Sequence, residues 1–446
     1  RPGTPPAAAP PPPPQPAHLA TTLDAVGELV TGHHGVLALG VLNAGPGPSG
    51  PLAAALTLPR GVTLDQPSGI VWDASHGAGY GYFRAPAAND TPVGDGWSCT
   101  GVGGTAPTCH RAAPLPAGQR TLAYLPVLVS DTADVGGKPS AVVTSGGSPA
   151  PAPATSPTAV SDGGLGAAYV TRGPAAVAMA GNTLASCPAF VFHCAQARLL
   201  QGPPPLWDNE AWGALMRPYD GDGEPRTDAS SAATLGVPAG ARVLWAGLYA
   251  GASGRPPGHP TVKVRPPGGA YTTLTLGDVQ CAEPGWQGFA DVTALVDRYG
   301  GGAWWAADVS AGGHPASRYA GWGLVVVYAR SGLPTRQVSV FDSLNLVTPS
   351  HPVRFALPAA TGGGAATAGV VAWEGDAQLT DDQLTVGDTT WDNVARSQAN
   401  GATPAGWDTF GVDVHDGPVA LAGGAPVLIG RSQREYWLLG VLSLVE

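Results

Sequence analysis

The sequence predicts an all-β protein, with an N-terminal immunoglobulin-like sandwich followed by a larger jelly-roll-like β-sandwich that carries one short helix. Apolar residues gather in short runs separated by Gly, Pro, Asp and Asn turns, as in chains built from many short strands. Two runs, 243–249 and 323–328, are apolar on both alternate faces, which is typical of central strands. The 65 Gly and 47 Pro favour disorder, but 13 Trp and 43% hydrophobic residues supply enough apolar surface for folded cores.

The charge balance excludes two classes of partner. A formal net charge of −10, without any basic run, argues against binding to nucleic acid or to anionic membrane surfaces. No stretch reaches the ~18 apolar residues that a membrane-spanning helix needs, so we expect no transmembrane segment in this chain. The chain starts at Arg1 with neither an initiator Met nor a signal peptide, and we expect it to be a mature or excised segment.

The first part of the chain divides into a spacer and a compact unit. Residues 1–23 are a spacer rich in Pro and Ala, and its prolines at 10–14 favour a stiff polyproline II segment, with a flexible remnant as the alternative. Residues 24–145 hold short strand-like runs within ~120 residues, as expected of an immunoglobulin-like sandwich. These runs are 36–43, 52–58, 69–72, 80–83, 121–130 and 140–144.

The second part begins after a change in composition. Residues 146–160 are a low-complexity linker of Pro, Ala and Ser, which we expect to act as a tether. Residues 161–446 are too many for a simple sandwich, so we expect about ten or more strands in two facing sheets. A split near residue 335 is the alternative, although no linker composition marks that point.

One short helix is expected at 291–299, between the two apolar strand runs. Asp291 is placed to cap its start and Gly300 to end it. Apolar residues recur there at helical spacing: Phe289, Val292, Leu295, Val296 and Tyr299.

The cysteines indicate the redox compartment. Cys99 with Cys109, and Cys187 with Cys194, are close pairs that each lie within one proposed domain, so we predict two short-loop disulfides and an oxidising exterior. Cys281 is left over. Free thiols and zinc ligation stay open as alternatives, although a C-x-x-C spacing, which structural zinc sites usually have, is absent.

The densest acidic cluster is a candidate calcium site. Asp220, Asp222, Glu224 and Asp228 lie in a Gly-containing loop, and alternate carboxylates supply the hard oxygen ligands that Ca²⁺ prefers. The EF-hand pattern fails because Pro225 stands where that loop needs Gly. A solvated turn is therefore the alternative, and we expect no other cofactor.

Two further groups suggest binding or catalysis. Trp304 and Trp305 are adjacent in an expected strand, so one points into the core and the other faces outward or under a loop, where it could stack on a sugar or peptide. A second acidic cluster could serve a glycosidase, with a plain turn as the alternative. Its members are Glu374, Asp376, Asp381 and Asp382. No established catalytic motif is present, so we predict no catalytic residue.

Several short motifs occur in a characteristic order along the chain. They include the strand–helix–strand segment 242–328, Gly181-Asn182-Thr183-Leu184, Asp220-Gly221-Asp222, Val340-Phe341-Asp342 and Glu374-Gly375-Asp376. This series resembles the β-sandwich modules of actinobacterial and Gram-positive cell-surface proteins catalogued as DUF11 or conserved-repeat proteins. The resemblance covers roughly the last two-thirds of the chain, and short motifs such as residues 58–62 extend it into the first sandwich.

The resemblance implies an extracellular, cell-surface structural or adhesive protein without catalytic activity. Its partners would be other surface proteins or glycans. A carbohydrate-binding module is the first alternative, favoured by an exposed Trp platform. A polysaccharide hydrolase is the second, favoured if two carboxylates converge in a cleft. The residues do not specify the ligand, the mode of anchoring or the oligomeric state.

Overall fold

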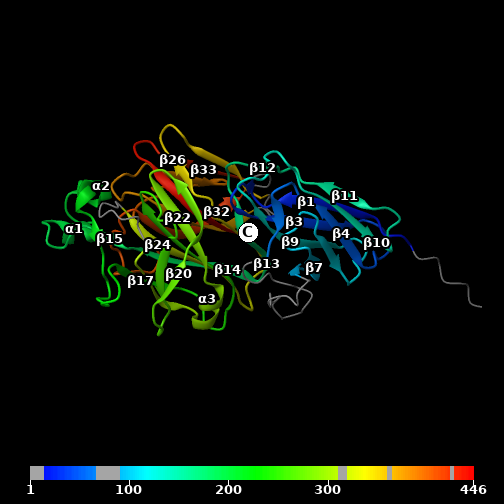
Figure 1. Cartoon of the computed structure of the whole chain (residues 1–446), viewed down its shortest axis with the longest axis horizontal. Coiled ribbons are helices and arrows are strands. Elements are labelled where there is room, and N and C mark those ends of the chain that lie inside the picture. The colour runs from blue at the N-terminus through cyan, green and yellow to red at the C-terminus, as the bar shows by residue number, and fades with distance from the viewer. Residues whose placement is uncertain (1–14, 67–90, 310–318, 359–363, 422–425) are drawn as a thin grey trace, which may run out of the picture.

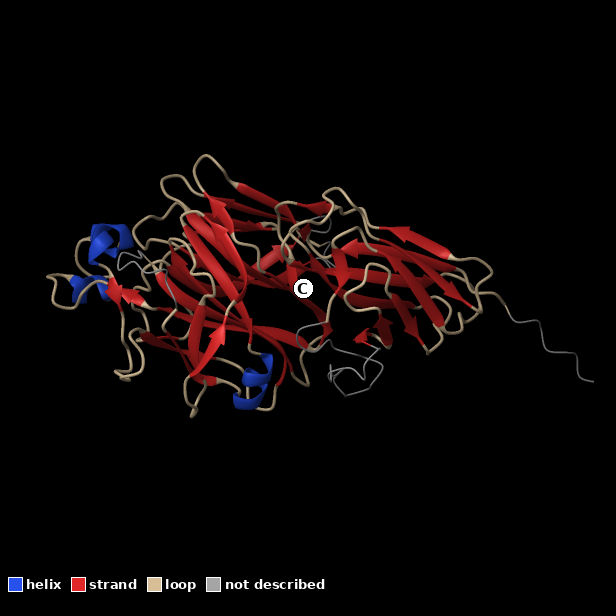
Figure 2. Cartoon of the chain, in the orientation of Figure 1, coloured by secondary structure: helices blue, strands red, loops and turns tan. Residues whose placement is uncertain are grey.

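The computed structural model describes residues 15–66, 91–309, 319–358, 364–421 and 426–446. The all-β prediction is confirmed: antiparallel sheets stack along an elongated molecule, and the few helices lie at one end and on one side (Figure 1, Figure 2). Two predicted strands, 69–72 and 80–83, and spacer residues 1–14 lie outside the described residues.

Two antiparallel sheets face each other in the N-terminal sandwich. One has, in spatial order, β1 (Leu19–Ala25), β3 (His34–Asn43), β9 (Arg120–Val129) and β5 (Val62–Leu64). The other has β11 (Ala152–Thr155), β10 (Ser140–Ser145), β4 (Leu52–Thr57), β8 (Thr108–Arg111), β7 (Trp97–Thr100) and β6 (Thr91–Gly94). Buried and exposed residues alternate strictly along β4, so one face of this sheet forms the core with the facing sheet.

The larger part of the chain contains two central sheets. The first has β13 (Ala167–Gly173), β25 (Arg336–Phe341), β34 (Trp437–Val445), β28 (Gly364–Trp373) and β32 (Val412–Leu421), with β26 (Asn345–Val347) also on β34. The second has β14 (Ala175–Thr183), β24 (Ala320–Ala329), β18 (Arg242–Ser253), β22 (Gly285–Asp291) and β21 (Gly277–Ala282).

Two outer sheets cover the central pair. One has β20 (Thr272–Thr275), β19 (Thr261–Arg265), β23 (Gly302–Ala307), β17 (Ser230–Leu235) and β31 (Ala402–Thr403). The other has β27 (Val353–Ala356), β33 (Val427–Arg431), β29 (Gln383–Val386) and β30 (Thr389–Asp392). A small sheet pairs β15 (Ala185–Ser186) with β16 (Arg217–Pro218).

Three hydrophobic cores separate these four layers. Tyr249 and Val325 belong to the core between the two central sheets, whereas Leu248 and Val326 face the outer sheet that contains β23. Because β18 and β24 have a core on each side, neither face needs polar residues. This arrangement explains the continuous apolar runs in the sequence, and it replaces the expected pair of facing sheets with a stack of four.

The predicted helix is confirmed as α3 (Thr293–Tyr299), beside β18. Asp291 accepts a hydrogen bond of 2.8 Å from the Thr293 backbone N–H, and Gly300 ends the helix with a φ of 67°. The expectation of a single helix is wrong, because α1 (Cys194–Arg198) and α2 (Asn209–Trp212) lie at one end of the molecule. Two turns of 3₁₀ helix, Pro204–Trp207 and Gly213–Leu215, accompany them.

The segment 146–160 differs from the tether that its composition predicts. Its residues 152–155 form β11, which pairs with β10 and extends the second N-terminal sheet. At its end, β12 (Val160–Ser161) pairs in parallel with β2 (Leu29–Val30). Pro153 is compatible with this edge position, because an edge strand has one row of N–H groups that needs no partner in the sheet. Paired backbone therefore replaces a free tether there.

A shared core joins the N-terminal sandwich to the four-layer stack. Val36 and Tyr124 of the sandwich belong to the same hydrophobic cluster as Val170 and Phe341 of the stack. Because this cluster is continuous, burial of apolar side chains holds the two parts together in addition to the chain connection. We call this contact region the junction.

Candidate functional site

Both predicted disulfides are present. Cys99–Cys109 joins neighbouring strands β7 and β8, and both sulfurs lie in the core of the N-terminal sandwich. Cys187–Cys194 closes the loop that leads into α1 at the far end of the molecule. Cys281, the remaining cysteine, is an exposed free thiol on β21. The pairing supports the oxidising compartment inferred from the sequence.

The first two carboxylates of the predicted calcium loop have protein partners. The hydroxyl of Ser230 lies within hydrogen-bond distance of two carboxylate acceptors, Asp220 at 2.8 Å and Asp222 at 2.7 Å. The guanidinium of Arg265 lies 2.9 Å from Asp222, and Tyr271 donates to the same carboxylate at 2.8 Å. Although burial alone would raise the pKa of Asp222, these hydrogen bonds and the arginine lower it below its usual value.

The other two carboxylates point elsewhere. Glu224 pairs with the exposed Arg226 at 2.8 Å. Asp228 is exposed, and its backbone N–H donates to Asp308. Within the described part of the chain, no three His, Cys, Asp or Glu side chains are arranged to hold a metal ion. The calcium site stays a prediction, and the observed loop is held by hydroxyl and arginine contacts.

The paired tryptophans alternate as the strand predicts. Trp304 is 1% exposed and donates its indole N–H to the carbonyl of Gly300 at 3.1 Å. Trp305 is half-buried on the opposite face, where the Arg265 guanidinium lies 4.5 Å from its ring centroid. Only Trp305 is therefore accessible, and its neighbour Arg265 already contacts its ring.

The structure brings Trp305 and the acidic loop together. A Cβ placed on Gly221 would lie 3.4 Å from the Trp305 ring and 3.3 Å from the Tyr219 ring, so this loop packs between the two aromatics. Tyr219 in turn lies 6.0 Å from Trp407. Half-buried aromatic rings thus follow one another across this side of the molecule. We call Trp305, Tyr219 and Trp407, with Arg265, the aromatic face.

The second acidic cluster is buried. Glu374, Asp376 and Asp382 are 2% exposed or less, and Asp381 is ion-paired with Arg434 at 2.9 Å. Gly375 is required by a close approach, because a Cβ there would lie 2.5 Å from Asp413. Three of the four carboxyl groups therefore lie inside the protein, and Asp381 lies nearer the surface with Arg434.

Asp376 of this cluster and the neighbouring Asp413 have altered acidity. Burial, followed by the neighbouring Asp208, raises the pKa of Asp376 to about 7. Burial also raises the pKa of Asp413 to about 7. Hydrogen bonds from the backbone N–H groups of residues 396–398 to its carboxylate act in the opposite direction. These groups are protonated more readily than ordinary carboxylates because the protein interior disfavours their charge.

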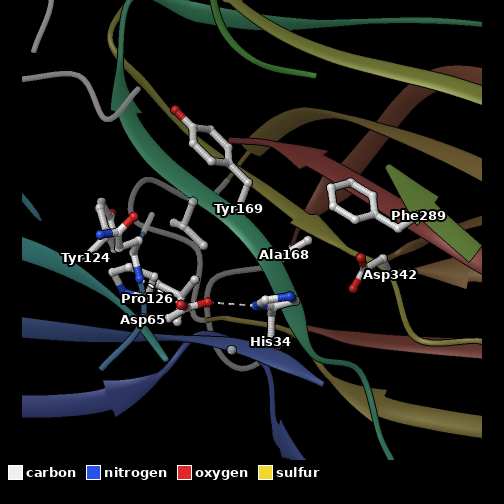
Figure 3. A pocket seen from close by; sticks show the side chains of 12 residues that line it. His34, Asp65, Tyr124, Pro126, Ala168, Tyr169, Phe289 and Asp342 are labelled. Atoms are coloured by element: carbon white, nitrogen blue, oxygen red, sulfur yellow. Dashed lines mark hydrogen bonds and ion pairs between the residues drawn. The ribbon is translucent and has the colours of Figure 1, made fainter. Parts of the chain in front are cut away.

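A separate cavity of about 180 Å³ lies at the junction, and sequence reasoning missed it (Figure 3). One wall comes from β3, β9 and the two residues after β5, and the other from β13, β22 and the residue after β25. The side chains that give it chemical character are His34, Asp65, Tyr124, Tyr169, Phe289 and Asp342. A cavity with aromatic walls and a few convergent polar groups is the usual form of a small-molecule site.

Hydrogen bonds fix the polar groups of this cavity. His34 pairs through Nδ1 with Asp65 at 3.1 Å, as the dashed line in Figure 3 marks. On the opposite wall, the hydroxyl of Tyr249 donates to Asp342 at 3.1 Å. His33, next along the chain, lies 3.5 Å from Asp278. His33 and His34 of the N-terminal sandwich therefore pair with one carboxylate from the four-layer stack, Asp278, and one from the sandwich itself, Asp65.

The pKa values of these groups reflect burial and pairing. Burial, then the nearby Asp278, raises the pKa of Asp342 to about 7. The hydrogen bond between His34 and Asp65, in which the carboxylate accepts, raises the pKa of His34. Burial lowers the pKa of His33, but its contact with Asp278 outweighs this and leaves it above its usual value. Asp342 therefore changes charge near neutral pH, and His33 and His34 hold their protons to a higher pH than usual.

Comparison with known proteins identifies no family. No family model and no curated protein matches the chain. A solved structure described as "Biofilm associated protein - BSP domain" aligns with 94% of this chain at 9% identity, and the chain spans 65% of that protein. The TM-score of 0.15 is too low for this likeness to carry an argument about fold or function.

Among the described residues, the longest helix has seven residues, which is too short to cross a membrane.

Proposed function

We propose that the chain is an extracellular, cell-surface structural or adhesive protein that acts by binding and carries out no catalysis. The observation that supports this most is the junction: a continuous apolar cluster couples the two β-sandwich parts into one elongated body. A rigid body of stacked sheets holds surfaces at fixed separations, which is what a scaffold or adhesin needs. The two disulfides support an extracellular location.

The resemblance to DUF11 or conserved-repeat surface proteins belongs to the same proposal. It agrees with the stacked sheets and the disulfides, and it predicts other surface proteins or glycans as partners. Antibodies against the folded chain should label intact source cells, and loss of the gene should reduce cell–cell or cell–surface attachment. Labelling that requires permeabilised cells, or attachment unchanged without the gene, would reject the proposal.

Carbohydrate binding is a second candidate, favoured by the aromatic face. Trp305, Tyr219 and Trp407 place half-buried rings along one side, and stacking on such rings is a common way to hold sugars. A glycan array should show binding that Trp305→Ala removes. Trp391→Ala is the matched control, because Trp391 is also half-buried but lies on the opposite outer sheet. Equal loss in both variants would argue against a site at the aromatic face.

The hydrolase alternative receives less support. Glu374 and Asp376 are buried among packed turns, and neither lines the junction cavity. A hydrolase needs carboxylates that reach both sides of a bound glycosidic linkage. Reproducible turnover of a polysaccharide, lost in both Glu374→Gln and Asp376→Asn, would favour an enzyme over a binding protein.

A further inference from the structure

The junction cavity is surrounded by aromatic rings. Tyr169 and Phe289, which line it, each stack with the buried Trp245, at ring-centroid distances of 5.6 Å and 6.0 Å. Tyr249 lies 5.4 Å from Phe289 and holds Asp342 through its hydroxyl. These rings therefore form an ordered apolar wall with a carboxylate fixed among them. The faces of such rings carry negative electrostatic potential.

The charges at the cavity favour a positive ligand. Asp65, Asp278 and Asp342 bring three carboxyl groups to this region, against the histidines His33 and His34. No lysine or arginine lines the described cavity. When the histidines are neutral, the described residues around the cavity have a net negative charge, because no lysine or arginine among them lines it. A buried carboxylate without a full countercharge is costly, so a cationic ligand would relieve that cost.

We propose that the junction cavity binds an organic ammonium group between Tyr169, Phe289 and Asp342. Aromatic walls with a nearby carboxylate are the arrangement that recognises alkylammonium ions. The volume of about 180 Å³ exceeds the ~150 Å³ that accommodates a benzene-sized ligand, so a trimethylammonium group or a lysine terminus fits. A neutral hydroxylated ring would fill the space but leave the carboxylates uncompensated.

This inference goes beyond the proposed structural or adhesive role and does not depend on it. The ammonium group can belong to a free small molecule or to a lysine side chain of another protein, since both present the same chemistry. Because the cavity walls come from both parts of the chain, ligand binding would also stabilise the junction.

The affinity should depend on pH in one direction. Protonation of Asp342 removes the attracting charge, and protonation of His33 or His34 adds a repelling one. Ammonium binding should therefore strengthen as the pH rises through about 7 and should release protons near that pH. The titratable groups that face the site from the packed elements are Asp65, Asp278, Tyr124, Tyr169, Tyr249, His33 and His34.

The test is calorimetry on the full chain with two ligands, choline and its uncharged isostere. In the isostere, a tert-butyl group replaces the trimethylammonium group. At about pH 8, we expect choline to bind at least about tenfold more tightly than the isostere, and at about pH 5 we expect this difference to disappear. Nα-acetyl-lysine amide and its norleucine counterpart form a second pair. Preference for choline indicates a free ammonium ligand, and preference for the lysine derivative indicates a protein ligand.

Variants locate the site. Asp342→Asn removes the buried charge and should weaken choline binding by about tenfold or more, whereas Phe289→Leu should weaken it several-fold. Asp24→Asn makes the same charge change at an exposed position of β1 and should bind choline like the unmodified chain. Thermal unfolding of each variant establishes that it is folded. Equal binding of choline and its isostere, unchanged affinity in folded Asp342→Asn, or no binding of either ammonium compound would overturn the proposal.

Discussion

The hydroxyl of Tyr124 on β9 donates a buried hydrogen bond of 3.0 Å to Oε1 of Gln337 on β25. These residues are 213 positions apart, and the bond links the N-terminal sandwich to the central sheet of the stack. Burial raises the pKa of Tyr124 far above its usual value, so the hydroxyl stays a neutral donor. The junction is therefore fixed by a directional polar contact as well as by apolar packing.

Replacing Tyr124 with Phe should destabilise the chain by about 1–3 kcal/mol, because Gln337 would keep a buried acceptor without its donor. Chemical denaturation measures this loss. Tyr328→Phe removes a hydroxyl from a half-buried position on β24 and should have a smaller effect, since water can replace the lost contact. Equal effects of the two substitutions would contradict the role assigned to Tyr124.

Alkylation of the native, unreduced protein should modify Cys281 and no other cysteine, because the other four are paired and Cys281 is exposed. Peptide mapping identifies the labelled position. Replacing Cys99 and Cys109 together by Ala should lower the free energy of unfolding by about 2–3 kcal/mol on the chain-entropy model. Labelling of all five cysteines in secreted material would exclude both bonds.

The adjacent tryptophans should respond differently to the same substitution. Trp304→Ala empties a core position and should cost about 3–5 kcal/mol of stability. Trp305→Ala removes a half-buried ring and its contact with Arg265, which should cost about 1 kcal/mol. Denaturant titration compares them. Similar losses would mean that the strand does not place the two rings on opposite faces.

Asp376 gives the stability of the fold a pH dependence whose sign can be checked. Its pKa in the folded state is about 7, above the ordinary 3.8, so between these values the folded chain holds a proton that the unfolded chain has lost. The stabilising contribution is present below about pH 4 and is lost as the pH rises through about 7. Asp376→Asn, which stays neutral, should therefore raise the unfolding midpoint at about pH 8 and change it little at about pH 4.

The matched control for that experiment is Asp24→Asn, which removes a carboxylate from an exposed strand position. Its effect on the midpoint should be small at both pH values, because an exposed carboxylate keeps its hydration in the folded state. A gain for Asp376→Asn that is the same at both pH values would mean that the proton equilibrium of this group is not coupled to folding.

Local patterns in the sequence predicted much of the architecture. Apolar runs identified β18 and β24, the pair Asp291 and Gly300 located α3, and strand alternation separated Trp304 from Trp305. Each of these features depends on residues within a few positions of one another. Cysteine spacing likewise predicted both disulfides, since each bond closes a short loop.

Features built from distant segments escaped prediction. The cavity combines His34, Tyr124, Phe289 and Asp342, and no local pattern indicates that four separated strands or strand ends converge. The segment 146–160 was also predicted differently from the structure. Its composition is that of a linker, but pairing of its residues 152–155 with β10 determines their conformation. Pairing with a neighbouring strand can override local composition when the edge of a sheet is available.

Strand β34 occupies the middle of its sheet, between β25 and β28, and all nine of its residues are buried. It is also the last strand in the described chain, so the sheet lacks its centre until residues 437–445 have left the ribosome. Until then, the edges of β25 and β28 that pair with β34 have no partner, although β25 can pair with β13 and β28 with β32. The incomplete stack would therefore be prone to aggregation over that interval unless chaperones bind it. The strands of the N-terminal sandwich are synthesised much earlier, so that sandwich does not have the same delay.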